Sequence, residues 1–191
     1  MAEAGRRAGA DVNALLASLR GAYSLLYNHR SFPEEWVATT PDEIATVIKD
    51  VYHAQIRRLL PALGHRLSFL VLKCGTESPE LYDVGRLFEQ LNRELSEHCM
   101  NEDKGLLPLL SRESVAPGRL EQVAAELEHD HLRIAALVAQ IRALTLDYPL
   151  RRFDCPAMKA LYDEWRDIEE LTMRSIFLEE NKLIPLAREN Y

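Results

Sequence analysis

Hydrophobic side chains recur at intervals of three and four residues along most of the chain, which is the spacing of one face of an α-helix. The pattern predicts four long amphipathic helices, over about residues 40–73, 79–110, 117–146 and 156–188. A shorter amphipathic stretch precedes them, over about residues 10–28. No alternating strand pattern persists. We therefore expect an all-α fold: an up-down-up-down four-helix bundle over residues 41–191, with an extra N-terminal helix and a linker over residues 1–40.

The second and fourth predicted helices carry an internal repeat. Residues 98–110 read HCMNEDKGLLPLL, and residues 175–187 read SIFLEENKLIPLA. Glu, Leu and Pro recur at the same offsets, as Glu102 and Glu179, Leu106 and Leu183, and Pro108 and Pro185. A histidine precedes each segment at a similar interval, at His53 and His129. The repeat is broken at one position, because Ser175 stands where the first copy has His98.

The repeated Glu residues lie on the hydrophobic faces of their helices. His98 and Glu102 are four residues apart and share the stripe of Leu91, so both are expected to point into the bundle. Glu179 and Ser175 share the inward stripe of the last helix in the same way. Burying a Glu among leucines is expensive unless it is paired or bound to a cation. The pattern therefore predicts a metal site built from facing helices.

Three further side chains are candidates for this site. His53 shares a face with Ile56, and Cys74 lies about six turns further along near the same face. In the third predicted helix periodicity slightly favours His131, which lies on a hydrophobic stripe, over His129. Imidazole and carboxylate ligands suit iron, manganese or zinc, and composition does not choose among them.

Composition excludes several other classes of protein. The chain has 23 Lys and Arg residues against 30 Asp and Glu, which gives a net charge of −7. It has no stripe of basic residues, so we expect no nucleic-acid binding. No hydrophobic run approaches the ~18 residues that span a bilayer, and the first residues lack the continuous apolar core of an export signal. Three widely spaced cysteines fit a reducing compartment better than a disulfide framework. We expect a cytoplasmic protein without a membrane partner.

The order and spacing of these motifs resemble a known family. The segments ELSEHCMNEDKGLLPLL, LEHDH and LEENKLIPLA are similar to those of the hemerythrin-like (HHE cation-binding) domain, and most of all to its di-iron branch of iron–sulfur cluster repair proteins. The resemblance covers about residues 41–188. It implies a helical bundle that holds two non-haem irons bridged by two carboxylates.

The resemblance also implies a ligand set. It assigns His53, His98 and His129 as terminal ligands and Glu102 and Glu179 as bridges. On this ground His129 is preferred to His131.

Two of the family's histidines are missing, since they fall on Ser175 and Cys74; the thiolate of Cys74 is a candidate replacement ligand. The resemblance places His53 and His98 on the same iron, so we expect one intact metal position and one degraded position.

The expected function is binding of one or two non-haem iron ions, with zinc or manganese as alternatives. The resemblance implies a role in the repair of iron–sulfur clusters or in the response to nitrosative or oxidative stress, with iron–sulfur proteins, O2 or NO as partners. Whether the protein is an enzyme, and whether it is a monomer or a homodimer, stay open. Two alternatives are a sensor or interaction module without catalysis, and a degenerate metal-free bundle.

Overall fold

The computed structural model describes residues 40–110, 116–145 and 156–189. The helices within these ranges belong to one compact unit, Pro41–Tyr191. The helix predicted over about residues 10–28 lies outside the described residues.

Four long helices occupy the described residues, and their bounds follow the predicted ones closely. The first runs through α3 (Pro41–Val47), the π-helical segment η2 (Ile48–His53) and α4 (Ala54–Cys74). The second runs through α5 (Glu80–Asn101), the π-helical segment η3 (Glu102–Leu106) and α6 (Leu107–Leu110). The third is α7 (Pro117–Leu144). The fourth runs through α8 (Pro156–Leu178), the π-helical segment η4 (Glu179–Leu183) and α9 (Ile184–Glu189).

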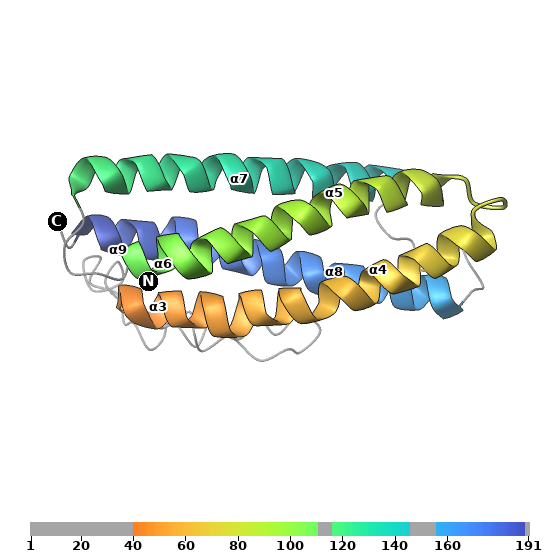
Figure 1. Ribbon diagram of the computed structural model, residues 1–191, viewed down its shortest axis with the longest axis horizontal. Helices are drawn as coiled ribbons and strands as arrows, with labels where there is room; N and C mark the ends of the chain where they lie inside the picture. Colours follow the sequence, from red (N-terminus) through yellow and green to blue (C-terminus); the bar gives the residue numbers. More distant parts are fainter. Residues whose placement is uncertain (1–39, 111–115, 146–155, 190–191) are drawn as a thin grey trace, which may run out of the picture. The chain divides into compact units, whose positions relative to one another are not determined.

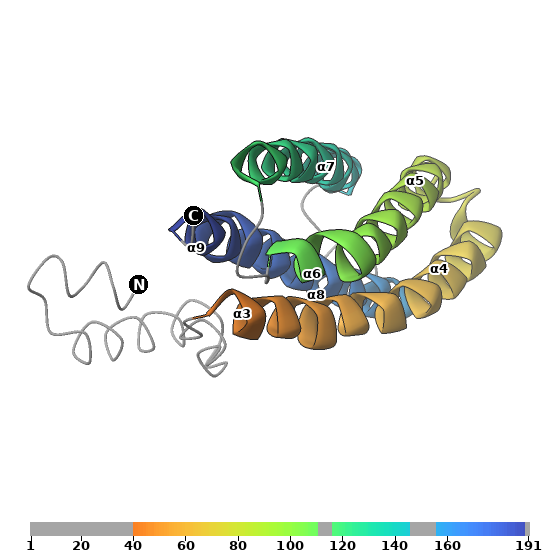
Figure 2. The same ribbon diagram turned by 60° about the vertical axis from the view of Figure 1, so that its left-hand side comes forward.

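The helices form the predicted bundle, in which α5 lies between α4 and α7, and α8 returns beside α4 (Figures 1 and 2). Leucine, isoleucine and aromatic side chains from all four helices meet in one core, which includes the edge-to-face pair Phe88 and Trp165. The inward stripes of the sequence therefore become the core, and the all-α prediction is confirmed.

The three π-helical segments lie at the same end of the bundle. The segment η2 is near the start of the first helix, whereas η3 and η4 are near the ends of the second and fourth, and neighbouring helices run antiparallel. A π turn contains one more residue than an α turn and is frequent at functional sites. After Glu102 the next buried side chain is Leu107, five residues later, so the inward stripe shifts by one residue at η3. The same three segments contain His53, Glu102 and Glu179.

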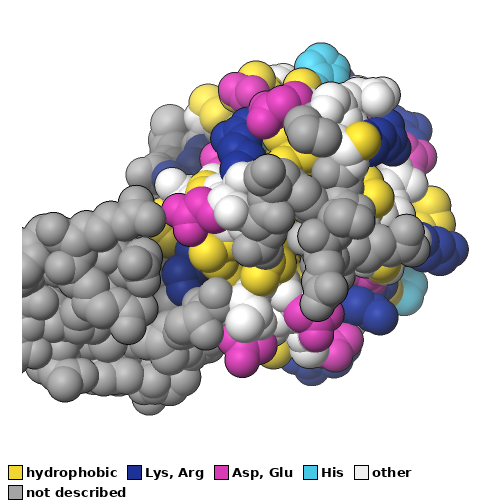
Figure 3. Space-filling view, turned by 90° about the vertical axis from the view of Figure 1, so that its left-hand side faces the viewer, with side chains coloured by type: hydrophobic (Ala, Val, Ile, Leu, Met, Phe, Trp, Pro, Cys, Tyr) yellow, Lys and Arg dark blue, Asp and Glu magenta, His cyan; other side chains and the backbone are white. Residues whose placement is uncertain are grey.

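No helix among the described residues combines the length and the hydrophobicity needed to cross a membrane. Figure 3 views the end of the molecule at which α3, α6 and α9 lie, and acidic and basic side chains are interspersed with hydrophobic ones on its visible coloured part. The described residues visible in this view form no broad basic area of the kind that nucleic-acid binding needs.

The turn between α4 and α5 depends on Gly75. A Cβ atom at this position would lie 2.4 Å from the carbonyl oxygen of Val71 and 2.8 Å from the ring of Tyr82.

We expect Gly75→Ala to lower the free energy of unfolding by about 1–3 kcal/mol, because the backbone must shift to admit the methyl group. Gly118→Ala is the matched control, since nothing lies within 4 Å of its Cβ position in the first turn of α7. That variant should be stabilised by ~0.5–1 kcal/mol. Urea unfolding of both variants measures the difference, and equal effects would contradict it.

Candidate metal centre

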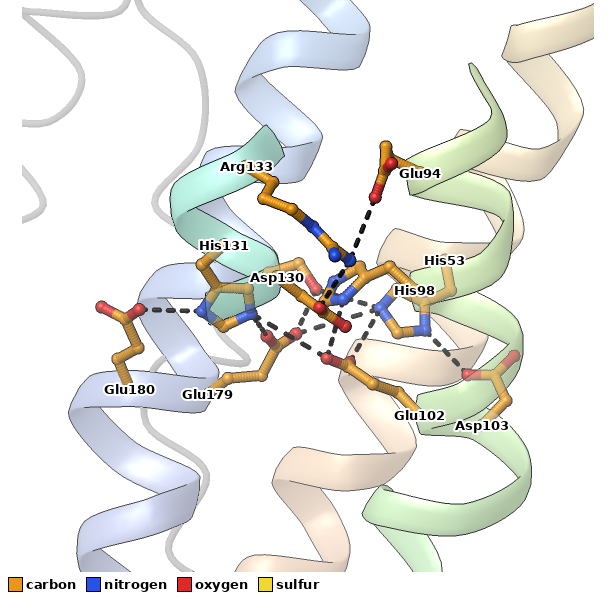
Figure 4. Close-up of polar contacts among 11 residues, drawn as sticks. His53, Glu94, His98, Glu102, Asp103, Asp130, His131, Arg133, Glu179 and Glu180 are labelled. Atoms are coloured by element: carbon orange, nitrogen blue, oxygen red, sulfur yellow. Dashed lines mark hydrogen bonds and ion pairs between the residues drawn. The ribbon is translucent and has the colours of Figure 1, made fainter. Parts of the chain in front are cut away.

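A cluster of buried polar side chains interrupts the hydrophobic core where the π-helical segments meet (Figure 4). His53 and Glu179 are 0% exposed, Glu102 is 1% exposed, and His98 is 4% exposed. One ligand atom from each of these four residues lies within 4.8 Å of the others. The inward placement predicted for the His98–Glu102 pair and for Glu179 is therefore what the structure shows.

His131 of α7 completes the cluster. Its side chain is 4% exposed, and its Nε2 atom lies 2.8 Å from Oε2 of Glu179. His129 is exposed and lies outside the cluster, so the preference for His129 was wrong. The two residues are about 200° apart around the helix, so only one of them can face inward. The hydrophobic stripe shared with Leu127 and Ile134 was the signal that pointed to His131.

The two buried carboxylates stand between the histidines and present opposite oxygens to two sides. On one side, Nε2 of His53 lies 3.5 Å from Oε2 of Glu102 and 3.9 Å from Oε1 of Glu179. On the other side, Nδ1 of His98 lies 3.1 Å from Oε1 of Glu102. Nε2 of His131 approaches that same oxygen to 3.9 Å and Oε2 of Glu179 to 2.8 Å. A carboxylate that offers one oxygen to each side can bridge two cations.

The resemblance placed His53 and His98 on the same iron, and the two do offer ligand atoms within 4.8 Å of each other, but His98 also lies near His131. The ring of His98 is 5.2 Å from the ring of His131 and 5.9 Å from the ring of His53, measured between centroids. His98 therefore lies slightly closer to His131, and the two share the nearest carboxylate oxygen of Glu102.

Ser175 lies on the His53 side of the cluster. Its side chain is 1% exposed, and its hydroxyl donates a hydrogen bond of 2.7 Å to Oε1 of Glu179. Oγ of Ser175 is also 3.3 Å from Nε2 of His53. The break in the sequence repeat thus falls inside the cluster, at the position that faces His53.

Cys74 is outside the cluster, so its proposed role as a replacement ligand was wrong. It is the last residue of α4, a helix of 21 residues that starts directly after His53. The two side chains share a face, but at 1.5 Å per residue they are about 30 Å apart along the axis. Cys74 instead packs against the hydrophobic core at the far end of the bundle.

Two carboxylates that the sequence analysis passed over contact the outer nitrogens of two histidines. Oδ1 of Asp103 lies 2.7 Å from Nδ1 of His53, and Oε1 of Glu180 lies 2.8 Å from Nδ1 of His131. Each follows a repeated Glu directly, so the doublets Glu102–Asp103 and Glu179–Glu180 were the available signal.

The innermost polar atoms have the property expected of cation ligands. Nδ1 of His98, Nε2 of His131, both oxygens of Glu102 and Oε2 of Glu179 are buried and make no hydrogen bond; their contacts are the ion pairs with one another described above. Buried polar atoms almost always find a partner, and each one left without a partner costs about 1–3 kcal/mol. Imidazole nitrogens and carboxylate oxygens gathered in this way fit iron, manganese or zinc.

The sequence matches a family whose members share this chemistry. The Hemerythrin HHE cation binding domain matches residues 47–187, which include every residue of the cluster. The chain belongs to this family.

Relatives of this hemerythrin-domain protein are named for cluster repair. It is 28% identical over 155 residues to the iron-sulfur cluster repair protein YtfE of Edwardsiella ictaluri, a match that covers 80% of this chain and 68% of that protein. It is 26% identical over 152 residues to a probable iron-sulfur cluster repair protein of Haemophilus influenzae, covering 80% and 67%. It is 22% identical over 144 residues to the iron-sulfur cluster repair protein ScdA of Staphylococcus epidermidis, covering 74% and 64%. Part of each relative's length lies outside the match.

Without a cation, the charges of this hemerythrin centre balance one another through proton uptake. Burial lowers the pKa of His98 to about 4. Burial also opposes the charge on His131, but Glu102 and Glu179 outweigh it and raise the pKa of His131 to about 10. Burial and the adjacent Glu179 raise the pKa of Glu102 well above its ordinary value. In the metal-free state the imidazolium of His131 therefore pairs with Glu179, and ionisation of Glu102 is disfavoured.

Replacing His131 should destabilise the metal-free protein in a pH-dependent way. Because its pKa rises from 6.5 to about 10 on folding, its contribution is fully present below pH 6.5 and is lost as the pH rises through about 10. We expect His131→Gln to lower the free energy of unfolding by about 3–5 kcal/mol at pH 6.5, because it leaves a buried carboxylate unpaired. The loss should be smaller at pH 10 and above.

His129→Gln is the matched control, and as an exposed substitution it should change stability by less than ~0.5 kcal/mol at either pH. Urea unfolding of the chelator-treated protein measures both variants. Equal losses in the two variants would contradict the inward placement of His131.

Proposed function

We propose that this hemerythrin-domain protein binds non-haem iron between Glu102 and Glu179 and acts in the repair of iron–sulfur clusters. The observation that carries the proposal is the set of buried imidazole and carboxylate atoms without hydrogen-bond partners, which converge from the second, third and fourth long helices beside His53 of the first. The names of the three relatives support the choice of repair. Zinc and manganese satisfy the same donor set, so the choice of iron rests on the family.

The two sides of the cluster offer different numbers of ligands. His98, His131, Glu102 and Glu179 would supply four protein ligands to one cation. On the other side His53 would act with the second oxygen of each carboxylate, while the hydroxyl of Ser175 occupies the place of a fourth ligand. A neutral hydroxyl is a much weaker ligand than imidazole. We infer one complete metal position, at His98 and His131, and one incomplete position, at His53.

Bound iron would supply a redox-active cation that can be donated or can react with small molecules such as O2 or NO. The chain's own residues would hold it by charge, since the two carboxylates neutralise most of its charge in a medium of low dielectric constant. The apolar shell of Cys99 and Leu95 beside His98 restricts the access of water to the centre.

Metal analysis of the reconstituted protein tests the inferred asymmetry. We expect one tightly held iron per chain in the natural protein. Ser175→His should raise this number towards two, because it adds an imidazole on the His53 side. Adding His53→Ala to Ser175→His should return the number to one, which makes the double variant the control for the position of the gain. Two tightly held irons in the natural protein would contradict the incomplete position, and no iron would contradict the metal proposal.

A repair assay tests the proposed activity separately. The iron-loaded protein is added to an iron–sulfur enzyme that NO has inactivated, and recovery of that enzyme's activity is measured. We expect faster recovery than with free ferrous iron at the same concentration, and loss of the effect with His98→Ala. His65→Ala is the control, because His65 is exposed on α4 outside the cluster. Recovery that His98→Ala leaves unchanged would contradict repair through this centre.

A further inference from the structure

We propose that Asp103 and Glu180 are equivalent positioning residues, which aim the imidazoles of His53 and His131 at the metal site. The inference rests on the proposed metal site and extends it to two residues outside the ligand set. Asp103 lies 2.7 Å from Nδ1 of His53, and Glu180 lies 2.8 Å from Nδ1 of His131 (Figure 4). Both contacts have hydrogen-bond geometry, unlike the contacts between the ligand atoms of the centre.

These contacts determine which ring nitrogen faces the centre. An ionised carboxylate only accepts hydrogen bonds, so the hydrogen in each contact belongs to Nδ1 of the histidine. In a neutral imidazole the lone pair is then on Nε2. Nε2 is the atom that lies 3.5 Å from Glu102 in the case of His53, and 2.8 Å from Glu179 in the case of His131. Asp103 and Glu180 therefore hold each imidazole so that the lone pair of its Nε2 points to the metal site.

The backbone of both repeats serves this arrangement. Each positioning carboxylate directly follows a carboxylate of the centre, and η3 and η4 begin at Glu102 and Glu179. In a regular α-helix adjacent side chains diverge by about 100°. At each wider π turn the first carboxylate enters the centre, and the next one reaches the outer nitrogen of a histidine on a neighbouring helix. The same device occurs in both copies, which argues against a chance surface ion pair.

The two positioning residues differ in how firmly they are held. Asp103 is 13% exposed and also binds Arg57, at 2.5 Å. Glu180 is 43% exposed and lines a surface pocket together with Glu121, Ala124, Ala125, Glu128, Ile184 and Arg188. Water can therefore compete for Glu180 more readily than for Asp103. The hydrogen bond between Glu180 and His131 is therefore the one that water can replace more easily.

Retention of Zn²⁺ alone tests the role of Glu180. Zn²⁺ suits the same donors and is diamagnetic, so its release to a chromogenic chelator and the ring ¹⁵N signals of His131 can both be measured. We expect Glu180→Ala to weaken Zn²⁺ binding by about 10–100-fold. It should also remove the restriction of the His131 proton to Nδ1. Glu180→Gln should keep part of the affinity, because its carbonyl oxygen still accepts a hydrogen bond.

Glu128→Ala is the matched control, since Glu128 is exposed in the same pocket and forms no hydrogen bond or ion pair with a histidine among the described residues. It should leave Zn²⁺ retention and the His131 signals unchanged. If the natural protein holds Zn²⁺ and Glu180→Ala behaves like Glu128→Ala, the positioning role is overturned while the metal site stands. A natural protein that holds no Zn²⁺ would overturn both.

Asp103→Ala tests the equivalent role on the other side, because it removes the acceptor of the His53 hydrogen bond. In the Ser175→His background it should lower occupancy of the second metal position and leave the first occupied. Loss of the first position with retention of the second would overturn the assignment of Asp103 to His53.

Discussion

Two carboxylates buried against each other, Glu102 and Glu179, are the constraint on which the rest of this bundle depends. They are 1% and 0% exposed, and their carboxyl groups lie together in the low-dielectric interior. An unpaired buried charge costs several kcal/mol, so the surroundings must supply positive charge or protons. Histidines from three helices surround the pair, and in the metal-free state one of them carries the compensating charge. A bound cation would relieve the same constraint without protons.

The internal repeat explains how one chain surrounds the two carboxylates, because each copy supplies a similar set of side chains. Each copy contributes a buried Glu at the start of a π-helical segment, a histidine from the preceding long helix and a carboxylate that contacts this histidine from outside. The copies are no longer identical, because Ser175 faces the site where His98 stands in the other copy. The two copies therefore match in their buried Glu and in the carboxylate that follows it, and differ at the position of Ser175.

Helical periodicity predicted the bundle and the inward carboxylates, because burial follows a regular stripe over many turns. A shared face does not make two residues neighbours: 21 residues of helix separate Cys74 from His53, which places it about 30 Å away at the other end of the bundle. Periodicity favoured His131, and the resemblance to relatives shifted the choice to His129, which is exposed. The role of Asp103 could not be read from a regular helix, since a residue adjacent to Glu102 points about 100° away unless the turn widens.

Anomalous diffraction at the iron edge, from crystals of the reconstituted protein, tests the central claim most directly. The account predicts the strongest iron peak between Glu102 and Glu179 on the side of His98 and His131. A weaker peak or none should lie on the side of His53 and Ser175. The strongest peak on the His53 side would contradict the inferred asymmetry. No peak between the two carboxylates would contradict the metal centre itself.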